Sequence, residues 1–427
     1  VTLSTGAATF AVVLSLLPKV LAGEHPGAEW FEVLPGVALA FELEPLGMVY
    51  ALVAAGLWIP TSLYTIGYMR GHHEKNQTRF FACFAVAIFA ALGIAFARNL
   101  FTLFFFYELL TFSTYPLVTH HGTPEAKKAG RIYLGILVFT SVVGLLFGIL
   151  WTWSLTGTLE FKLGGILGGA PTGVLPWLLG LFAFGTGKAA LMPFHRWLPN
   201  AMVAPTPVSA LLHAVAVVKA GVFTVLKVIV YVFGLDLLTS TGASQWLMAV
   251  AAFTMLAASI KALTLDNLKA RLAYSTISQL AYIVLAAALA TGMSALGGGM
   301  HIAMHAVGKI TLFFCAGAIY VAAHKTKVSE LDGIGRRMPW TMAAFFVASL
   351  SIIGIPPLGG AWSKWFMGLG AVEGGNGLYV AVYMISSLLS IGYLMPVVVR
   401  AWFRKERVDE HHHDHGEAPL LCVLPLC

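Results

Sequence analysis

Ionisable side chains stand inside long apolar runs of this sequence, and they are of types that can carry protons. An ionisable group in hydrocarbon costs at least ~2.5 kcal/mol on insertion scales, so each one needs a partner, water or a function. Carboxyl, ammonium and imidazole groups all change protonation when their surroundings change. We therefore expect a proton path, and its candidate residues in chain order are Glu108, Lys188, His213, Lys219, His301, His305, Lys309 and Lys364.

The first two candidates form an acid and base pair. Glu108 lies in NLFTLFFFYELLTFSTYPLV and is the acid that we expect to be buried inside a span, either as a proton carrier or as a neutral carboxyl bonded to a neighbouring helix. Lys188 lies in LFAFGTGKAALMPFH, just before a helix break where freed carbonyl groups and water could solvate an ammonium. A Glu108 to Lys188 pair could switch its charge state as protons pass, and the alternative is a fixed buried salt bridge.

The next apolar run, SALLHAVAVVKAGVFTVLK, contains His213 and Lys219 six residues apart. Histidine exchanges protons readily near neutral pH, which suits a relay between lysines. A satisfied core histidine and a buried structural lysine are the plainer alternatives. Lys227, near the end of the same run, is a weak candidate because its side chain could snorkel outward.

A third run, HIAMHAVGKITLFFCAGAIY, places His301, His305 and Lys309 at i, i+4 and i+8, on one helical face. Two such histidines could bind a metal, but no carboxylate or thiol accompanies them and there is no HExxH motif. A proton or water wire is the better interpretation. Lys364 follows a second helix break and is the expected last station before the outside, with snorkelling as the alternative.

The composition requires a membrane around these residues. Hydrophobic residues make up 58% of the 427 residues and charged residues only 11%, with a mean hydropathy of +0.82. A soluble domain carries roughly a quarter charged residues, so this chain cannot cover a water-facing surface. Disordered, disulfide-stapled and nucleic-acid-binding classes are excluded for lack of polarity, cysteine or surface charge. We expect a multi-pass protein of the bacterial or archaeal cell (inner) membrane.

About twelve apolar runs are long enough to span, since a span needs about 20 residues. Basic residues in short loops mark the cytoplasmic side, and most of the 26 Lys and Arg fall after the even-numbered runs, whereas the opposite loops are acidic. The expected spans are 3–22, 47–69, 79–97, 99–118, 131–153, 174–192, 208–235, 244–263, 271–291, 298–323, 340–371 and 378–403.

Two spans are interrupted, by LMPFHRWLPNAMVAPTPVS and by IIGIPPLGGAWSK. Proline removes a backbone donor, so these stretches predict half-helices. The interruptions lie five spans apart and each has a lysine nearby, as an inverted repeat would produce. We expect a single membrane domain, 1–427, with repeat one at about 79–235, repeat two at about 244–403, and a short cytoplasmic loop at 404–417.

The other signals are weaker. The acidic run from Glu24 to Glu44 is expected to be a solvated outer loop, and HHHDH at 411–415 a soluble tail rather than a metal site. The four cysteines show no zinc or redox spacing. Nucleotide, haem and nucleophile motifs are missing, so we expect no cofactor, no metal and no covalent catalysis in this chain.

Several long motifs in order resemble one family. They are YELLTFSTYPLV, PFHRWLPNAMVAPTPVSALLHAVAVVKAG, DNLKARLAYSTISQLAY, HIAMHAVGKITLFFCAG and GIPPLGGAWSKW, and together they cover essentially the whole chain. The chain resembles the antiporter-like, proton-conducting membrane subunits shared by Mrp-type multisubunit cation/proton antiporters, respiratory complex I and membrane-bound hydrogenases. The broken-helix motif looks most similar to the D group of Mrp-type antiporter subunits.

The resemblance implies an all-α polytopic fold of fourteen helices in the full-length protein, with two inverted five-helix repeats; this chain would lack the first helix and most of the last. It also implies that Glu108, Lys188, Lys219 with His213, Lys309 and Lys364 carry protons, with Tyr107 standing where the family often has Trp.

The expected function is that of a proton-translocating subunit of a cation/proton antiporter. Its partners would be other membrane subunits, protons and Na⁺ or K⁺, in a lipid bilayer and without nucleic acid. The alternatives are the equivalent subunit of a complex I-like or hydrogenase-like redox pump, and an autonomous solute transporter with a roomy midplane pocket.

Overall fold

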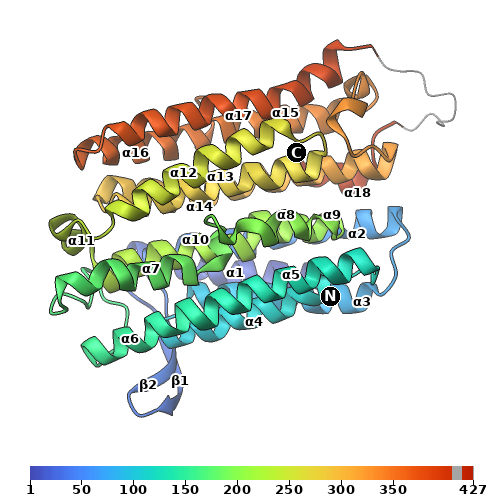
Figure 1. The fold of residues 1–427 in the computed structure, drawn as a ribbon. Helices are drawn as coiled ribbons and strands as arrows, with labels where there is room; N and C mark the ends of the chain where they lie inside the picture. The colour runs from blue at the N-terminus through green and yellow to red at the C-terminus, as the bar shows by residue number, and fades with distance from the viewer. Residues whose placement is uncertain (406–415, 427) are drawn as a thin grey trace.

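The computed structural model describes residues 1–405 and 416–426, and shows long helices that lie side by side (Figure 1). The HHHDH segment and most of the expected 404–417 loop lie outside the described residues. Within them, nine helical segments are long and apolar enough to cross a membrane. These segments are Thr2–Leu21, Pro45–Gly71, Gln77–Ala95, Leu100–Val118, Pro124–Thr156, Thr206–Phe233, Gln245–Thr264, Gly292–Ala323 and Leu378–Phe403.

The expected polytopic helical fold is confirmed, and each of the twelve expected spans has a helical counterpart. Two counterparts are shorter apolar helices, at Thr172–Gly185 and Pro339–Ile353. The α-helices are α1 Thr2–Leu21, α2 Pro45–Gly71, α3 Gln77–Ala95, α4 Leu100–Val118, α5 Pro124–Thr140, α6 Phe147–Thr156, α7 Leu175–Gly185, α8 Trp197–Asn200, α9 Thr206–Ala210, α10 Val217–Val228, α11 Leu235–Thr241, α12 Gln245–Thr264, α13 Leu268–Ala288, α14 Gly292–Ala323, α15 Pro339–Ile353, α16 Gly359–Glu373, α17 Leu378–Phe403 and α18 Leu420–Val423.

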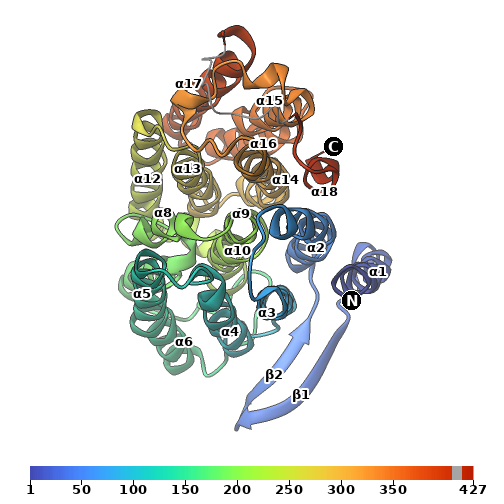
Figure 2. The same cartoon turned by 90° about the vertical axis from the view of Figure 1, so that its right-hand side faces the viewer.

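Helix α14 is the central element that positions most of the candidate residues. It packs against α2, α9, α13, α15 and α16, and Figure 2 shows it between α2, α10 and the α15–α17 group. Its start is fixed by a capping box, in which the Thr291 side chain accepts from the Ser294 backbone and the Ser294 side chain accepts from the Thr291 backbone. Helix α10 lies beside α14, so the charged residues of these two helices face one interior.

Both interruptions are present, but the first begins at Thr186, before the proline-rich stretch that predicted it, so that Lys188 lies within the break. Helix α7 ends at Gly185, and a single 3₁₀ turn, Gly187–Ala189, carries Lys188. Helix α15 ends at Ile353, and α16 begins at Gly359 after a short break. Gly221 of α10 faces the first interruption closely, because a Cβ at this position would clash with the backbone of Lys188 and Ala189. Glycine is therefore required for α10 to pack against the turn.

The acidic outer segment, expected to be a simple solvated loop, contains a β-hairpin instead. Strand β1, Gly27–Leu34, pairs antiparallel with β2, Val37–Glu42, and the hairpin projects from the bundle (Figure 2). Three carboxylates gather around the guanidinium of Arg98: Glu160 at 2.9 Å and Glu29 and Glu42 at 3.7 Å. These ion pairs tie the hairpin to the loop that follows α3.

A second charged cluster lies at the opposite end of the bundle, where α2 connects to α3 (Figure 1). Glu74 lies 3.1 Å from Nε2 of His121 and 3.6 Å from Nε2 of the buried His120. Hydrogen bonding to His120 and His121 lowers the pKa of Glu74 from 4.5 to about 2. The same bond to Glu74 raises the pKa of His121 above 6.5. This contact fastens the α2–α3 connection to the end of α4.

The cluster predicts a pH-dependent effect of Glu74→Gln on stability. The carboxylate contribution is present above pH 4.5 and is lost as the pH falls through about 2. The His121 contribution is present below pH 6.5 and is lost as the pH rises through its raised pKa. The melting-temperature difference from wild type, measured in detergent, should be largest between these limits and should shrink as the pH rises through the raised pKa of His121. A difference that does not vary with pH would contradict this assignment, and the exposed Glu125→Gln is the control.

Candidate functional site: a row of buried ionisable groups

Six of the eight candidate residues are buried in the protein interior. Lys188, His213, Lys219, His305 and Lys309 are completely inaccessible, and His301 is 1% exposed. Glu108 and Lys364 are half-buried. The six buried groups are all basic, and none of them can be charged in hydrocarbon without compensation. The groups that each one contacts therefore decide what the row can do.

The ammonium of Lys188 is held by helix α4. Its Nζ donates to the carbonyl of Tyr107 at 2.8 Å and to Oγ1 of Thr111 at 2.6 Å, and lies 3.2 Å from the centre of the Tyr107 ring. The backbone N–H of Lys188 in turn donates to the Tyr107 hydroxyl at 3.1 Å. One tyrosine thus fixes both the main chain of the 3₁₀ turn and the position of the charge.

Glu108 differs in part from the expectation for it. It lies between Tyr107 and Thr111 on α4, yet its side chain is only half-buried and its Oε1 atom has no hydrogen-bond partner within the described part of the chain. No ion pair within 4.0 Å joins it to Lys188 among the described residues. Lys188 bonds to the neighbours of Glu108 on the same helix instead, so the two groups are adjacent but separated.

His213 makes no hydrogen bond to the other candidates in the described part of the chain. It sits in the π-helical turn Leu211–Val215, and neither of its ring nitrogens has a hydrogen-bond partner among residues 1–405 and 416–426. Its ring centre is 4.6 Å from that of Phe313. A completely buried imidazole with two unpaired nitrogens is costly, so this position is poised to take up a water molecule or a proton.

Lys219 and the histidines of α14 form a connected series. Nζ of Lys219 lies 2.5 Å from Nδ1 of His305, and the rings of His305 and His301 are stacked with their centres 5.9 Å apart. His301 is held on both sides, by Oγ of Ser363 at 2.8 Å and by Oε1 of Gln279 at 3.0 Å. The short contact between Lys219 and His305 can hold one proton in either of two positions, on the amine or on the imidazole.

Lys309 bonds to α13 rather than to its histidine neighbours. Its Nζ donates to Oγ of Ser275 at 2.6 Å, and the Ser275 hydroxyl donates to the Tyr393 hydroxyl at 3.0 Å. Ser390 and Tyr393 share a further hydrogen bond of 2.8 Å. Lys309 therefore contacts a chain of hydroxyl groups, those of Ser275, Tyr393 and Ser390, that leads to α17.

Lys364 is held by the carbonyl groups that the second helix break frees. In a continuous helix the carbonyls of Ile352 and Ile353 would accept from residues 356 and 357, but both of these are proline and lack an N–H. Nζ of Lys364 donates to these two carbonyls, at 2.8 and 3.0 Å, and to Oγ of Ser387 at 2.9 Å. The ammonium therefore points into the break rather than snorkelling to the interface, and a cavity of about 630 Å³ lies beside it.

The contacts connect the second half of the row more completely than the first. The ring of Tyr282 lies between Lys364, at 4.7 Å, and His301, at 5.7 Å, so contacts run from Lys219 to Lys364. Between Lys188 and Lys219 no hydrogen bond is found in the described part of the chain. The residues that hold the ammonium and imidazole groups were not foreseen, because each is an ordinary hydroxyl or amide: Thr111, Ser275, Gln279, Ser363 and Ser387.

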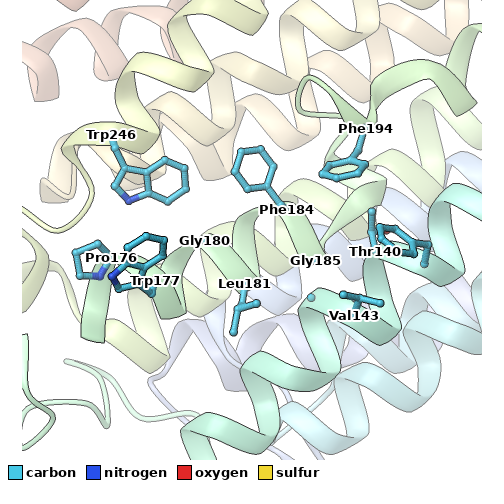
Figure 3. Close-up of a pocket in the computed structure, with 12 residues that line it drawn as sticks. Thr140, Val143, Pro176, Trp177, Gly180, Leu181, Phe184, Gly185, Phe194 and Trp246 are labelled. Carbon is cyan, nitrogen blue, oxygen red and sulfur yellow. The ribbon is translucent and has the colours of Figure 1, made fainter. Parts of the chain in front are cut away.

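The pocket in Figure 3 lies beside the first break but is not part of the row. It measures about 620 Å³ and is lined mostly by aromatic and small residues, among them Trp177, Phe184, Phe194 and Trp246. Trp177 is 73% exposed, so the pocket opens on the outer, lipid-facing surface of the bundle. Among residues 1–405 and 416–426, no group of three or more His, Cys, Asp and Glu residues is placed to hold a metal ion.

Comparison with known proteins confirms the family resemblance. The family model described as NADH:quinone oxidoreductase/Mrp antiporter, TM, matches residues 97–390. NADH-quinone oxidoreductase subunit N of Desulforudis audaxviator is 32% identical over 375 residues, which are 87% of this chain and 74% of the relative. Subunit L of the same enzyme from Campylobacter jejuni is 29% identical over 402 residues, which are 93% of this chain and 65% of the relative.

Solved membrane complexes share the fold. A chain of the Mrp complex from Dietzia sp. superposes with a TM-score of 0.83 at 22% identity, covering 95% of this chain and 75% of that one. A chain of the archaeal membrane-bound sulfane sulfur reductase superposes with a TM-score of 0.85 at 24% identity, covering 99% and 86%. The match over residues 97–390 includes every candidate of the row. The chain therefore belongs to the NADH:quinone oxidoreductase/Mrp antiporter transmembrane family and is an antiporter-like, multi-pass membrane subunit.

Proposed function

We propose that this chain translocates protons as one subunit of a larger membrane complex. The observation that carries the proposal is the buried row itself, in which Lys188, Lys219 and Lys309 are completely inaccessible and bonded to neutral groups. A buried lysine that bonds only to neutral groups can lose its proton readily, because desolvation opposes the charged form and no bonded carboxylate offsets it.

The contacts suggest the order of transfer. A proton on Lys219 would move along the 2.5 Å contact to His305, pass by His301, and reach Lys364 through the hydroxyl groups around Tyr282. Lys309 and Ser275 would supply a side branch towards α17. Each transfer breaks one N–H or O–H bond and forms another, and leaves the oxidation state of every group unchanged.

The missing contact between Lys188 and Lys219 would be the controlled step. Lys188 is now bonded to Tyr107 and Thr111, while Glu108 stands free on the same helix. A movement of α4 that brings Glu108 to Lys188 would favour the charged lysine, and its reversal would release the proton to the row. The driving complex would act by changing this distance.

A neighbouring subunit would cover the face of α4 that carries Glu108. The carboxylate is half-buried at mid-helix, and Phe105 and Phe112 beside it are 48% and 55% exposed. A carboxylate facing hydrocarbon is costly, whereas the same group at a protein interface can be paired. The named relatives are subunits of multisubunit enzymes, which supports this arrangement.

We infer two inverted five-helix repeats at about 79–235 and 244–403, because both breaks lie at corresponding places and each has a lysine beside it. We place the protein in the cell membrane of a bacterium or archaeon, since the two relatives described above are bacterial.

For the driving reaction, the names of the curated relatives favour a complex I-like redox enzyme, and the likeness to the Mrp complex keeps a cation/proton antiporter as the second candidate. An autonomous solute transporter is disfavoured, because the pocket of Figure 3 is apolar and opens towards lipid rather than enclosing a polar solute.

Replacing Lys188 with Ala should abolish proton translocation. The measurement is ΔpH in inverted membrane vesicles that contain the full-length protein with its operon partners, energised with an electron donor or challenged with Na⁺ or K⁺. A ΔpH that builds with the electron donor in wild type and is absent in the variant supports the redox pump. The variant would lose it because the row would lack its first proton-binding group. A preformed ΔpH that collapses on cation addition, again only with Lys188 present, supports the antiporter.

The exposed Lys128→Ala serves as the matched control, since it removes a lysine from the surface without touching the row. Equal amounts of assembled complex must be compared. Wild-type activity in Lys188→Ala would overturn the proposed proton row under either driving reaction.

Replacing Thr111 with Val should slow translocation without changing the shape of α4. The ammonium of Lys188 would lose its 2.6 Å acceptor, and a hydrogen bond to a charged group contributes ~1.5–3 kcal/mol, which corresponds to about tenfold or more in rate. Thr111→Ser keeps the hydroxyl and should retain most of the activity. If Val and Ser behave alike in the vesicle assay, Thr111 does not solvate the transported proton.

A further inference from the structure

The sequence makes Lys227 only a weak candidate, because its side chain could snorkel outward, but the structure buries it completely in a pair with Glu44. The side chain of Lys227 has no exposed surface and that of Glu44 has 7%. Nζ of Lys227 lies 3.0 Å from Oε1 of Glu44, an ion pair without hydrogen-bond geometry in this structure, and donates to the carbonyl of Ala97 at 2.8 Å. The rings of Phe161 and Phe223 lie 4.7 and 5.4 Å from the ammonium. This pair belongs to neither the row nor the surface.

The carboxylate is held from the other side as well. Oε2 of Glu44 accepts from the Tyr231 hydroxyl at 3.0 Å and from the backbone N–H of Leu46 at 2.6 Å, as the N-cap of α2. Tyr231 is half-buried, and the hairpin residue Glu42, two positions before Glu44, is 36% exposed and joined to Arg98. The pair therefore lies directly beneath the hairpin end of the bundle, the end that the basic residues assign to the outside (Figure 1).

The same helix connects this pair to the row. Lys219 and Lys227 both lie on α10, eight residues and about 12 Å apart along the axis. Thr224 lies one turn before Lys227, and its buried hydroxyl has no hydrogen-bond partner in the described part of the chain. Thr224 lies five residues and about 140° around the helix from Lys219, so a water molecule held by its unpaired hydroxyl would be needed to complete a path between the two lysines.

We propose that Glu44 and Lys227 form an outer proton-exchange site for the first half of the chain, in addition to Lys364 in the second. This inference rests on the proposed proton translocation. The Lys227 ammonium passes a proton to Oε1 of Glu44, so that one N–H bond breaks, one O–H bond forms and both groups become neutral. The carboxyl group then releases the proton to water at the hairpin end, and the Lys227 amine receives another from Lys219 by way of Thr224.

Lys227→Arg separates this role from a structural one. Arginine keeps the positive charge and can pair with Glu44, but it cannot be deprotonated in a protein. In the assembled complex in inverted vesicles we expect Lys227→Arg and Glu44→Gln each to lower proton translocation at least about tenfold. Lys162→Arg, the same change at an exposed outer lysine, should leave it unaltered. Wild-type translocation in Lys227→Arg would overturn the proposal.

Measuring Lys188→Ala beside these variants distinguishes a failure of the proposed proton row from a failure of the proposed outer site. If Lys188→Ala retains activity, proton translocation by the row is wrong and the outer site falls with it. If Lys188→Ala is inactive while Lys227→Arg and Glu44→Gln translocate normally, the row stands and the outer site alone is wrong.

A second measurement covers the case in which these variants do not assemble. Infrared difference spectra of the working wild-type complex should show a protonated carboxyl C=O band, and Tyr231→Phe should shift that band because it removes the hydroxyl that donates to Glu44. Tyr231→Phe leaves the pair with Lys227 in place. A band that does not shift, or no carboxyl band during turnover, would contradict proton transfer to Glu44.

Discussion

The structure depends on one constraint, which is that an ammonium group in hydrocarbon must be given acceptors without being neutralised. A bonded carboxylate would stabilise the charged form more strongly, and the described residues instead supply carbonyl, hydroxyl and imidazole acceptors to Lys188, Lys219 and Lys309. Such acceptors stabilise the charged form only in part. The lysines can therefore lose their protons at moderate cost, which a transported proton requires.

The helix breaks follow from this constraint. A regular helix uses its carbonyl groups in its own hydrogen bonds, so an ammonium must share one of them, as Lys188 does with Tyr107, or find acceptors at an interrupted helix or on side chains. Pro356 and Pro357 free two carbonyls for Lys364, and Gly221 lets α10 approach the turn that holds Lys188. The proline and glycine residues of this chain thus determine where a charge can reside.

The sequence predicts the helices and the candidate residues well because both depend on local chemistry. Apolar length marks a span, proline marks a break, and a lysine inside an apolar run is conspicuous. The partners of the lysines and of His301 could not be predicted, since Thr111, Ser275 and Gln279 come from other helices and resemble any polar residue of a membrane bundle. Lys227 was undervalued for the same reason, because Glu44 lies far away in the sequence, in a segment expected to be a loop.

The two halves of the chain differ in the way they hold their charges, and this difference bears on mechanism. From Lys219 to Lys364 the groups form a series of hydrogen bonds and ring contacts, whereas Lys188 bonds only to α4 and to its own turn among the described residues. In the proposed mechanism, protons would cross the series with small local movements, and the larger gap lies between Lys188 and Lys219. We therefore place regulation at the gap between Lys188 and Lys219, where a small shift of α4 would exchange Thr111 for Glu108 as the partner of Lys188.

The face of α4 that carries Glu108 also carries exposed phenylalanines, and a neighbouring subunit could act on it. The control point and the contact with the driving complex would then be the same helix.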